Sequence, residues 1–398
     1  MKNRNTSTVR IARFAGIGLA AISLMAGTTS VMAGEAAMAG TGTGSRYAAA
    51  REPLAETLPE AQYAMSEIEA ERESQDEDTR ETLQEDTECF FRIDRDDPEA
   101  WRDELENVRF LTDVNMSGSA QFSEDQFHDL AQQLREVSDD VWIVDCRLES
   151  HGLANGIAVS LCSEDNAANL GKEADEVMTE EEELSSLIGA AITAFTTEKD
   201  QPIDSTEILV ETWKTEKTLV EEEGFRYLRL ACPDHCWPPA NVIDDFIAMT
   251  QIMDDDAWLH FHCQAGSGRT GAFMTIYEMM QRPDASVEEI LQHQAETGSG
   301  NLLDHAAPEK SFDQKARSVM GRAMYRYINE NRESDYEQTW SSWIQEHTQT
   351  ETLKIGESLD AEEGFSCAPL ILSDSLEAVG EGQAIAISGD TVYYVTVE

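Results

Sequence analysis

Three short apolar runs in the middle of the chain have the length and composition of buried β-strands. They cover residues 141–144, 225–230 and 258–261, and each passes directly into a cluster of polar residues. Stretches with helical spacing of apolar residues lie around them, at residues 127–137, 242–253, 271–280 and 316–329. This alternation predicts an α/β fold with a mostly parallel sheet and helices on both faces. Ligands in such folds bind beyond the carboxyl ends of the strands, which is where the polar clusters fall.

The pattern differs towards both ends of the chain. Residues 384–387 and 392–397 are apolar runs around a Ser-Gly-Asp turn, which predicts a hairpin within a small β-rich extension over residues 348–398. Residues 34–88 hold few aromatic side chains, and between Glu52 and Glu88 there are 14 acids against two bases. That composition predicts a solvated, disordered leader. The segment between them, residues 89–347, has the pattern of the main globular unit.

The first 33 residues have the pattern of a secretory signal peptide. Positive charges between Lys2 and Arg13 precede an apolar stretch over residues 14–26, and Val31-Met32-Ala33 offers a cleavage site with small residues. The apolar stretch falls well short of the roughly 20 residues that a membrane-spanning helix needs. We therefore expect an exported protein, periplasmic or secreted, whose mature chain has no membrane span.

Composition and charge exclude two classes of protein. The chain is 41% hydrophobic and has seven tryptophans, which does not fit a wholly disordered or fibrous protein. Its 78 acidic and 29 basic residues give a net charge of −49, so nucleic acid and anionic membranes would repel it.

The chain has seven cysteines, an odd number, which leaves at least one thiol unpaired. The pairing stays open, because Cys232 and Cys236 could pair with each other, pair elsewhere or remain reduced.

The segment that follows the third predicted strand carries the chemistry of a nucleophile, and its sequence is His262-Cys263-Gln264-Ala265-Gly266-Ser267-Gly268-Arg269-Thr270. Loop amides and a helix N-terminus stabilise anionic oxygens, so residues 264–268 would bind a phosphate group. The same field favours the thiolate form of Cys263, which would attack phosphorus, while Arg269 offers a fork to two phosphate oxygens. Thr270 can donate a hydrogen bond to the Cys263 sulfur. In agreement, residues 257–277 contain no acid.

A candidate general acid lies about 30 residues upstream, in Pro233-Asp234-His235-Cys236-Trp237-Pro238. Attack on a phosphate ester needs a proton for the departing alkoxide, and Asp234 stands at the end of a predicted strand on a loop stiffened by proline. His235 would contact a substrate phosphate or orient Asp234. Together the two segments provide a nucleophile, an anion site and an acid.

These segments resemble the protein tyrosine phosphatase-like inositol polyphosphatases of bacteria, also called cysteine phytases. Both His-Cys-x-x-Gly-x-Gly-Arg-Thr and Asp-His-x-Trp-Pro are similar to motifs of that family, and the resemblance spans residues 107–347. It implies a tyrosine-phosphatase-like core with a small partial β-barrel inserted beside it, forming a single catalytic unit. It also implies a cysteinyl-phosphate intermediate without metal or cofactor, and it adds His262 to the catalytic residues.

Further stretches carry the same resemblance. Arg109 matches a substrate-binding arginine of the family, and the family also places phosphate-binding bases near Lys310, Lys315 and Arg317. The run over residues 144–152 is similar to a family segment but departs from it at Cys146 and Leu148. Its polar residues form either a salt-bridged scaffold or a pocket wall. Asp145 is the substrate-side candidate, whereas Arg147 and Glu149 are expected to be structural.

We therefore expect a phosphatase that hydrolyses inositol polyphosphates, phytate foremost, with a protein tyrosine or dual-specificity phosphatase as the alternative. A substrate with six phosphates needs several cations around the pocket. The candidates are Arg109, His235, Lys310, Lys315 and Arg317. The net charge opposes long-range attraction of a polyanion at low salt. A binding module without turnover would lack Cys263 or Asp234, and a sulfur-transferring enzyme would not need the Asp-His-x-Trp-Pro loop.

Overall fold

The computed structural model describes residues 90–94, 104–163, 166, 168–198, 201–254, 256–300, 302–303, 312–361, 364–373 and 375–398. The predicted signal peptide and acidic leader, residues 1–88, lie outside this range, as does Lys310. Among the described helices, none combines the length and the apolar character that crossing a bilayer requires.

A five-stranded sheet forms the centre of the fold. Its strands run in the order β10-β4-β11-β3-β2. They are β2 (Arg109–Leu111), β3 (Met116–Ser119), β4 (Val141–Asp145), β10 (Arg226–Arg229) and β11 (Trp258–His262). All neighbouring strands are parallel except the edge pair of β2 and β3. The mostly parallel sheet is thus confirmed, and the three strands predicted from apolar runs lie side by side within it.

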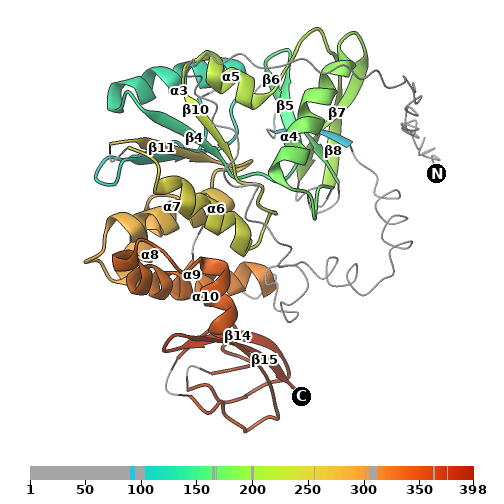
Figure 1. The fold of residues 1–398 in the computed structure, drawn as a ribbon. Helices are drawn as coiled ribbons and strands as arrows, with labels where there is room; N and C mark the ends of the chain where they lie inside the picture. Colours follow the sequence, from blue (N-terminus) through green and yellow to red (C-terminus); the bar gives the residue numbers. More distant parts are fainter. Residues whose placement is uncertain are drawn as a thin grey trace, which may run out of the picture. The chain divides into compact units, whose positions relative to one another are not determined.

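Alternation along the strands divides the core into two layers. On β4, Val141 and Ile143 pack with α3 (Glu124–Val137) and α5 (Glu216–Glu222), whereas Val144 faces the opposite cluster. That second cluster contains α6 (Ala240–Thr250) and α7 (Gly268–Gln281). Successive side chains of a strand point to opposite faces, so these short runs are buried on both sides. Figure 1 shows the two helix pairs on opposite sides of the sheet.

Helix α3 shows how local sequence sets an element's boundary. The Ser123 side chain accepts a hydrogen bond from the Gln126 amide, and the Gln126 side chain accepts one from the Ser123 amide. This capping box satisfies two amides that the first helical turn leaves free. The helix therefore begins at Glu124, three residues before the apolar repeat that predicted it at residue 127.

Three further helices extend the larger core cluster. They are α8 (Val287–Glu296), α9 (Phe312–Asn331) and α10 (Trp340–Glu346), with a short 3₁₀ turn η5 (Arg332–Ser334) after α9. Trp340 and Trp343 stack with ring centroids 5.6 Å apart, and Tyr327 of α9 packs edge-on against both. Aromatic packing of this kind buries a large apolar area and ties α10 to α9.

A second, six-stranded sheet lies beside the central one in the same unit. Its order is β8-β7-β1-β6-β5-β9. The strands are β1 (Phe90–Ile93), β5 (His151–Ala154), β6 (Ile157–Cys162), β7 (Ala191–Glu198), β8 (Gln201–Leu209) and β9 (Trp213–Lys214). Helix α4 (Ala174–Glu183) and the 3₁₀ turn η4 (Leu184–Leu187) join β6 to β7. This sheet corresponds to the small β unit expected beside the core.

The carboxyl-terminal residues form a third sheet, called here the C-terminal sheet. It consists of β12 (Thr348–Leu353), β13 (Phe365–Ser366), β14 (Gly382–Ser388) and β15 (Thr391–Val397), in the order β12-β15-β14-β13. Strands β14 and β15 pair antiparallel across the predicted turn, with Ser388 opposite Thr391. The hairpin prediction is confirmed.

The packing of Phe246 on α6 predicts a large stability effect. Its ring lies 5.4–5.8 Å from the rings of Phe261 and Phe273, and it is fully buried. Phe246→Ala is expected to lower the free energy of unfolding by about 3–5 kcal/mol, because the cavity cannot collapse completely. Urea unfolding followed by tryptophan fluorescence measures this. Ile252→Ala is the control, since Ile252 is 65% exposed and should change the free energy by less than about 0.5 kcal/mol. Equal losses in both variants would contradict this account of the core.

Candidate active site

The candidate nucleophile lies at the carboxyl end of the central strand β11. Cys263 follows β11 directly and is 3% exposed, and α7 begins five residues later at Gly268. The Cys146 amide, after the neighbouring strand β4, donates a 2.9 Å hydrogen bond to the His262 carbonyl and fixes the point where the chain leaves the sheet. The position agrees with the expectation that ligands bind at this edge.

The loop between Cys263 and α7 turns its carbonyl oxygens outward. Four donors from other segments hold them, at 2.7–3.1 Å: Gln121 N to Gln264 O, Asn107 Nδ2 to Ala265 O, Arg109 Nη1 to Gly266 O, and Gly300 N to Ser267 O. The amides of residues 264–268 donate to no acceptor within the described part of the chain. A run of free amides beside a helix N-terminus is an anion site.

Gly266 is the position where this loop demands a glycine. Its φ is +71°, which side chains disfavour. A Cβ there would lie 2.5 Å from the Ser119 carbonyl carbon and closer still to the Ala120 amide nitrogen. The loop therefore packs directly on the backbone that follows β3.

A cavity of about 350 Å³ opens above the loop. Its lining residues are Asp234, His235, Cys263, Gln264, Ala265, Ser267, Gly268, Arg269, Gly300 and Arg317. The nucleophile loop after Cys263, the general-acid loop around Asp234 and the predicted basic residue Arg317 therefore line the same cavity. A cavity with a few convergent polar groups is the usual form of a small-molecule site.

Arg269 is buried beneath this cavity and shared between two carboxylates. Its Nη1 and Nη2 donate to Glu149 at 2.6 and 2.9 Å, and Nη2 also donates to Asp234 at 3.1 Å. Burial acts to raise the pKa of Glu149, but the charge of Arg269 outweighs it and holds that pKa well below its usual range. The bidentate pair fixes the plane of the guanidinium.

Asp234 is held in place from three sides. Asn166 donates to its Oδ2 at 3.0 Å, the His235 amide donates to its Oδ1 at 2.8 Å, and Arg269 provides the third contact. Burial acts to raise the pKa of Asp234, but the charge of Arg269 prevails and the pKa is lowered. Without a bound anion, Asp234 is therefore ionised at neutral pH.

Two cationic or polar side chains complete the rim. Arg317 of α9 lines the cavity, and burial lowers its pKa although nearby acidic groups oppose that shift. Its Nη1 lies 3.1 Å from the point that a Cβ on Gly268 would occupy. His235 adopts φ of +64°, and its Nδ1 lies 3.2 Å from Gln314 Nε2 of the same helix. Helix α9 therefore lines the cavity through Arg317 and contacts the cavity-lining His235 through Gln314.

A cluster of buried charges lies behind the loop. His262 points into it, with Nε2 2.7 Å from Glu216 Oε1, and Glu216 also accepts hydrogen bonds from Gln121 and His151. Burial acts to raise the pKa of Glu216, but the charge of His262 opposes it and the pKa falls to about 2. Burial and Arg147 act to lower the pKa of His151, yet neighbouring carboxylates raise it to about 10. The charges in this cluster are thus mutually compensated.

Asp145 belongs to this cluster, which corrects its prediction as a substrate-side residue. It is fully buried, its Oδ2 accepts hydrogen bonds from Arg229 at 2.5 Å and Tyr227 at 2.6 Å, and it does not line the cavity. Among the described residues, Asp145, His151 and Glu216 place one potential metal-ligand atom each within 4.8 Å of one another. Arg229 already neutralises Asp145, so the arrangement fits an ion-pair network better than a cation site.

Other predicted residues have different positions from those expected. Arg109 donates a hydrogen bond to the Gly266 carbonyl and is not among the residues that line the cavity, so its visible role is to support the loop. Lys315 also lies outside the lining. The hydroxyl of Thr270 is buried and makes no hydrogen bond among the described residues, so the bond expected to the Cys263 sulfur is not formed.

Several residues of the site carried no signal in the sequence. Asn166 and Gln314 contact Asp234 and His235 from distant segments, and neither lies in a recognisable motif. Gly300 could have been noticed, because Gly298-Ser299-Gly300 marks a turn. No disulfide joins any two of the six described cysteines. Cys232 and Cys236 both contact the Pro233 carbonyl at 3.5 Å, which places the two thiols close together.

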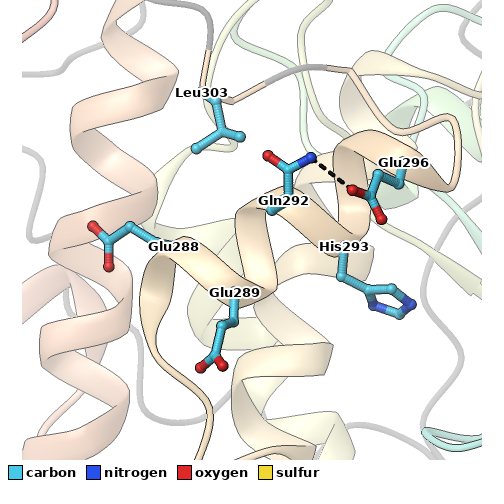
Figure 2. A pocket seen from close by; sticks show the side chains of 6 residues that line it. All are labelled: Glu288, Glu289, Gln292, His293, Glu296 and Leu303. Carbon is cyan, nitrogen blue, oxygen red and sulfur yellow. Dashed lines mark hydrogen bonds between the residues drawn. The ribbon is translucent and has the colours of Figure 1, made fainter.

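A larger hollow on α8 does not compete with this site. Figure 2 shows it, about 530 Å³ in volume and lined by Glu288, Glu289, Gln292, His293, Glu296 and Leu303. Three carboxylates in that lining would repel an anion. The hollow also contains no cysteine or arginine.

Comparison with known proteins gives consistent results. Residues 144–281 match the model of the PTP-like phytase family, whose description reads 'Inositol hexakisphosphate'. The tandemly repeated PTP-like phytase of Mitsuokella multacida has 32% identity and a TM-score of 0.59, covering 64% of this chain and 48% of its own. A PTP-like myo-inositol phosphatase structure from that organism contains myo-inositol-(1,3,4,5)-tetrakisphosphate. The PTP-like phytase of Bdellovibrio bacteriovorus has 28% identity and a TM-score of 0.53, covering 65% of this chain and 95% of its own.

One curated protein adds a more distant similarity. Effector protein hopD2 of Pseudomonas syringae pv. tomato (strain ATCC BAA-871 / DC3000) is 25% identical in an alignment over 184 residues that covers 43% of this chain and 38% of the effector. The chain therefore spans less than half the length of this relative and of the Mitsuokella protein.

The close approach at Gly266 predicts a specific loss of loop structure. Gly266→Ala is expected to lower the free energy of unfolding by about 2 kcal/mol more than Gly224→Ala, because both positions have positive φ but only Gly266 lacks space. The rate at which iodoacetamide alkylates Cys263, measured by mass spectrometry, should change only in Gly266→Ala. Indistinguishable behaviour of the two variants would show that the contact with Ser119 and Ala120 does not shape the loop.

Proposed function

Because the chain belongs to the protein tyrosine phosphatase-like phytase family, we propose that it is a phosphatase of inositol polyphosphates, with phytate as the main substrate. The inositol tetrakisphosphate complex of the Mitsuokella protein supports this substrate class. One geometric observation carries the proposal. Cys263 and Asp234 line one cavity together with the buried Arg269 and with four residues of the loop that carries the free amides, which are Gln264, Ala265, Ser267 and Gly268.

The first chemical step transfers the phosphoryl group to sulfur. The Cys263 thiolate attacks phosphorus, the bond from phosphorus to the inositol oxygen breaks, and Asp234 gives its proton to that oxygen. The loop amides and Arg269 stabilise the charge on the other phosphate oxygens as the geometry at phosphorus changes. The products of this step are a free inositol hydroxyl, a cysteinyl phosphate and an ionised Asp234.

The second step restores the enzyme. Water attacks the cysteinyl phosphate, Asp234 accepts a proton from that water, and the bond between sulfur and phosphorus breaks to release phosphate. Cys263 leaves as a thiolate, and the hydroxyl of Thr270 has no other partner among the described residues that would prevent it from turning towards the sulfur. Every group in both steps comes from the chain or from water, so the proposed reaction needs no metal.

Substrate binding would change the protonation of Asp234. In the unliganded site, Arg269 lowers the pKa of Asp234, which suits a base better than an acid. A phosphate dianion would pair with Arg269 and add negative charge beside the carboxyl group, and both effects favour the protonated form. Asp234 would thus gain its proton only when there is a substrate to receive it.

The charge of the cavity fits a polyanion although the whole chain does not. Arg269 and Arg317 lie within the cavity lining against the single carboxylate of Asp234. Salt screens the contacts between the two arginines and a bound anion less than it screens the long-range repulsion by the rest of the chain, which falls off over about 8 Å at physiological ionic strength.

We further propose that the enzyme is exported, on the evidence of the signal-like segment over residues 1–33.

The test compares two substrates and two variants. Phosphate release from phytate and from a phosphotyrosine peptide is measured with EDTA and reductant present. Phytate turnover should survive EDTA and fall by at least about 10⁴-fold in Cys263→Ser, because serine is a far weaker nucleophile at neutral pH. Cys162→Ser is the control, since Cys162 lies on β6 outside the cavity. Turnover of the peptide alone would identify a protein phosphatase, and full activity in Cys263→Ser would disprove the mechanism.

The role of Asp234 predicts the sign of the pH dependence. Since the bound enzyme needs a protonated Asp234, kcat should fall as the pH rises through the pKa of that group in the complex. Asp234→Asn should lower kcat by about 10²–10⁴-fold and remove this alkaline decline. Steady-state kinetics across pH 3–8 measure both. A decline that persists unchanged in Asp234→Asn would assign it to another group.

A further inference from the structure

Helix α9 presents one side to the cavity. Arg317 lines the cavity, and Gln314, three residues earlier and on the same side, contacts His235 of the general-acid loop at 3.2 Å. Both residues lie in the first two turns of a 20-residue helix. The first four amides of a helix have no partner within it, so such turns fray unless packing holds them.

The C-terminal sheet covers the other side of the same helix. Four apolar residues of α9 and four of the sheet belong to one core cluster: Ala316, Val319, Met320 and Ala323 with Ile385, Ile387, Val392 and Tyr394. The Tyr394 hydroxyl lies 3.8 Å from the Met320 sulfur, and the guanidinium of Arg322 stands 3.7 Å over the ring of Phe365. Burial raises the pKa of the Cys367 thiol, directly after β13, to about 11, and the positive charge of Lys315 acts to lower it, which agrees with Lys315 facing away from the cavity.

We propose that the C-terminal sheet is a brace that holds the first turns of α9, and thereby positions Arg317 and Gln314 for binding of a polyphosphorylated substrate. The sheet touches no reacting atom in this proposal, so it acts on affinity rather than on the chemical step. The inference rests on the proposed function for its kinetic consequence. Its structural part, the ordering of α9 by the sheet, does not depend on the substrate.

The sheet itself supplies a matched control. Along β15, Val392 and Tyr394 face α9, whereas Tyr393, Val395 and Val397 pack on a separate cluster formed by the sheet's own loops. Tyr393 and Tyr394 are therefore adjacent, identical in type and on opposite faces, as the period of two in a strand requires. If substrate affinity falls in a Tyr394 variant and not in the matching Tyr393 variant, general weakening of the sheet cannot be the cause.

The experiment measures kinetics with phytate and hydrogen exchange in the full chain. Tyr394→Ala should raise KM about tenfold, leave kcat within about twofold, and speed amide exchange over residues 314–320. Tyr393→Ala should leave all three within about twofold. Tyr394→Phe keeps the ring and should restore near-normal values, and Tyr394→Leu replaces Tyr394→Ala if the alanine variant does not fold.

A double variant tests the route of the effect. If the sheet acts through Arg317, Tyr394→Ala should raise KM by less than about twofold once Arg317→Gln is present, because the two changes remove the same interaction. Equal effects of the Tyr393 and Tyr394 variants, or fully multiplicative effects with Arg317→Gln, would overturn the proposal. If the wild type does not hydrolyse phytate, the proposed function fails instead. The brace is then judged by exchange alone, which supports it only if residues 314–320 exchange faster in Tyr394→Ala and not in Tyr393→Ala.

Discussion

The outward orientation of four consecutive carbonyl oxygens, from Gln264 to Ser267, is the constraint on which the rest of the site depends. A phosphate can bind here only if the amides face the cavity, and the amides face it only while other donors hold the carbonyls. Those donors come from three separate segments around Asn107, Gln121 and Gly300. The loop is therefore shaped by its surroundings and not by its own glycines alone.

The buried charges behind the loop serve the same purpose. Gln121 joins the two regions, because its amide holds the Gln264 carbonyl while its side chain bonds Arg147 and Glu216. Glu149 bridges Arg147 and Arg269 in the same way. Buried ion pairs contribute little net stability because desolvation opposes them, but removing one partner is costly. Such a network is better suited to fixing the direction of Arg269 than to stabilising the fold.

The chain as a whole is acidic, but the positions of its arginines make the cavity cationic. With a net charge of −49, the protein places Arg269 and Arg317 where burial strengthens their interaction with a bound anion. The acids that line the hollow on α8 are not among the residues that line this cavity. The local arrangement of charge, rather than its total, therefore decides which ligand the site accepts.

The sequence by itself determined the parts that depend on local order. The strands β4, β10 and β11, the hairpin of β14 and β15, and the loop from Cys263 to Thr270 all follow from periodicity, turn residues and motif spacing. Only the tertiary structure decided which polar residues meet. Glu149 reaches Arg269 across 120 positions of the chain and Asn166 reaches Asp234 across 68, while Asp145 is withdrawn into the core by Arg229 and Tyr227. Pairing of buried charges depends on which segments the fold brings together, and no local pattern records that.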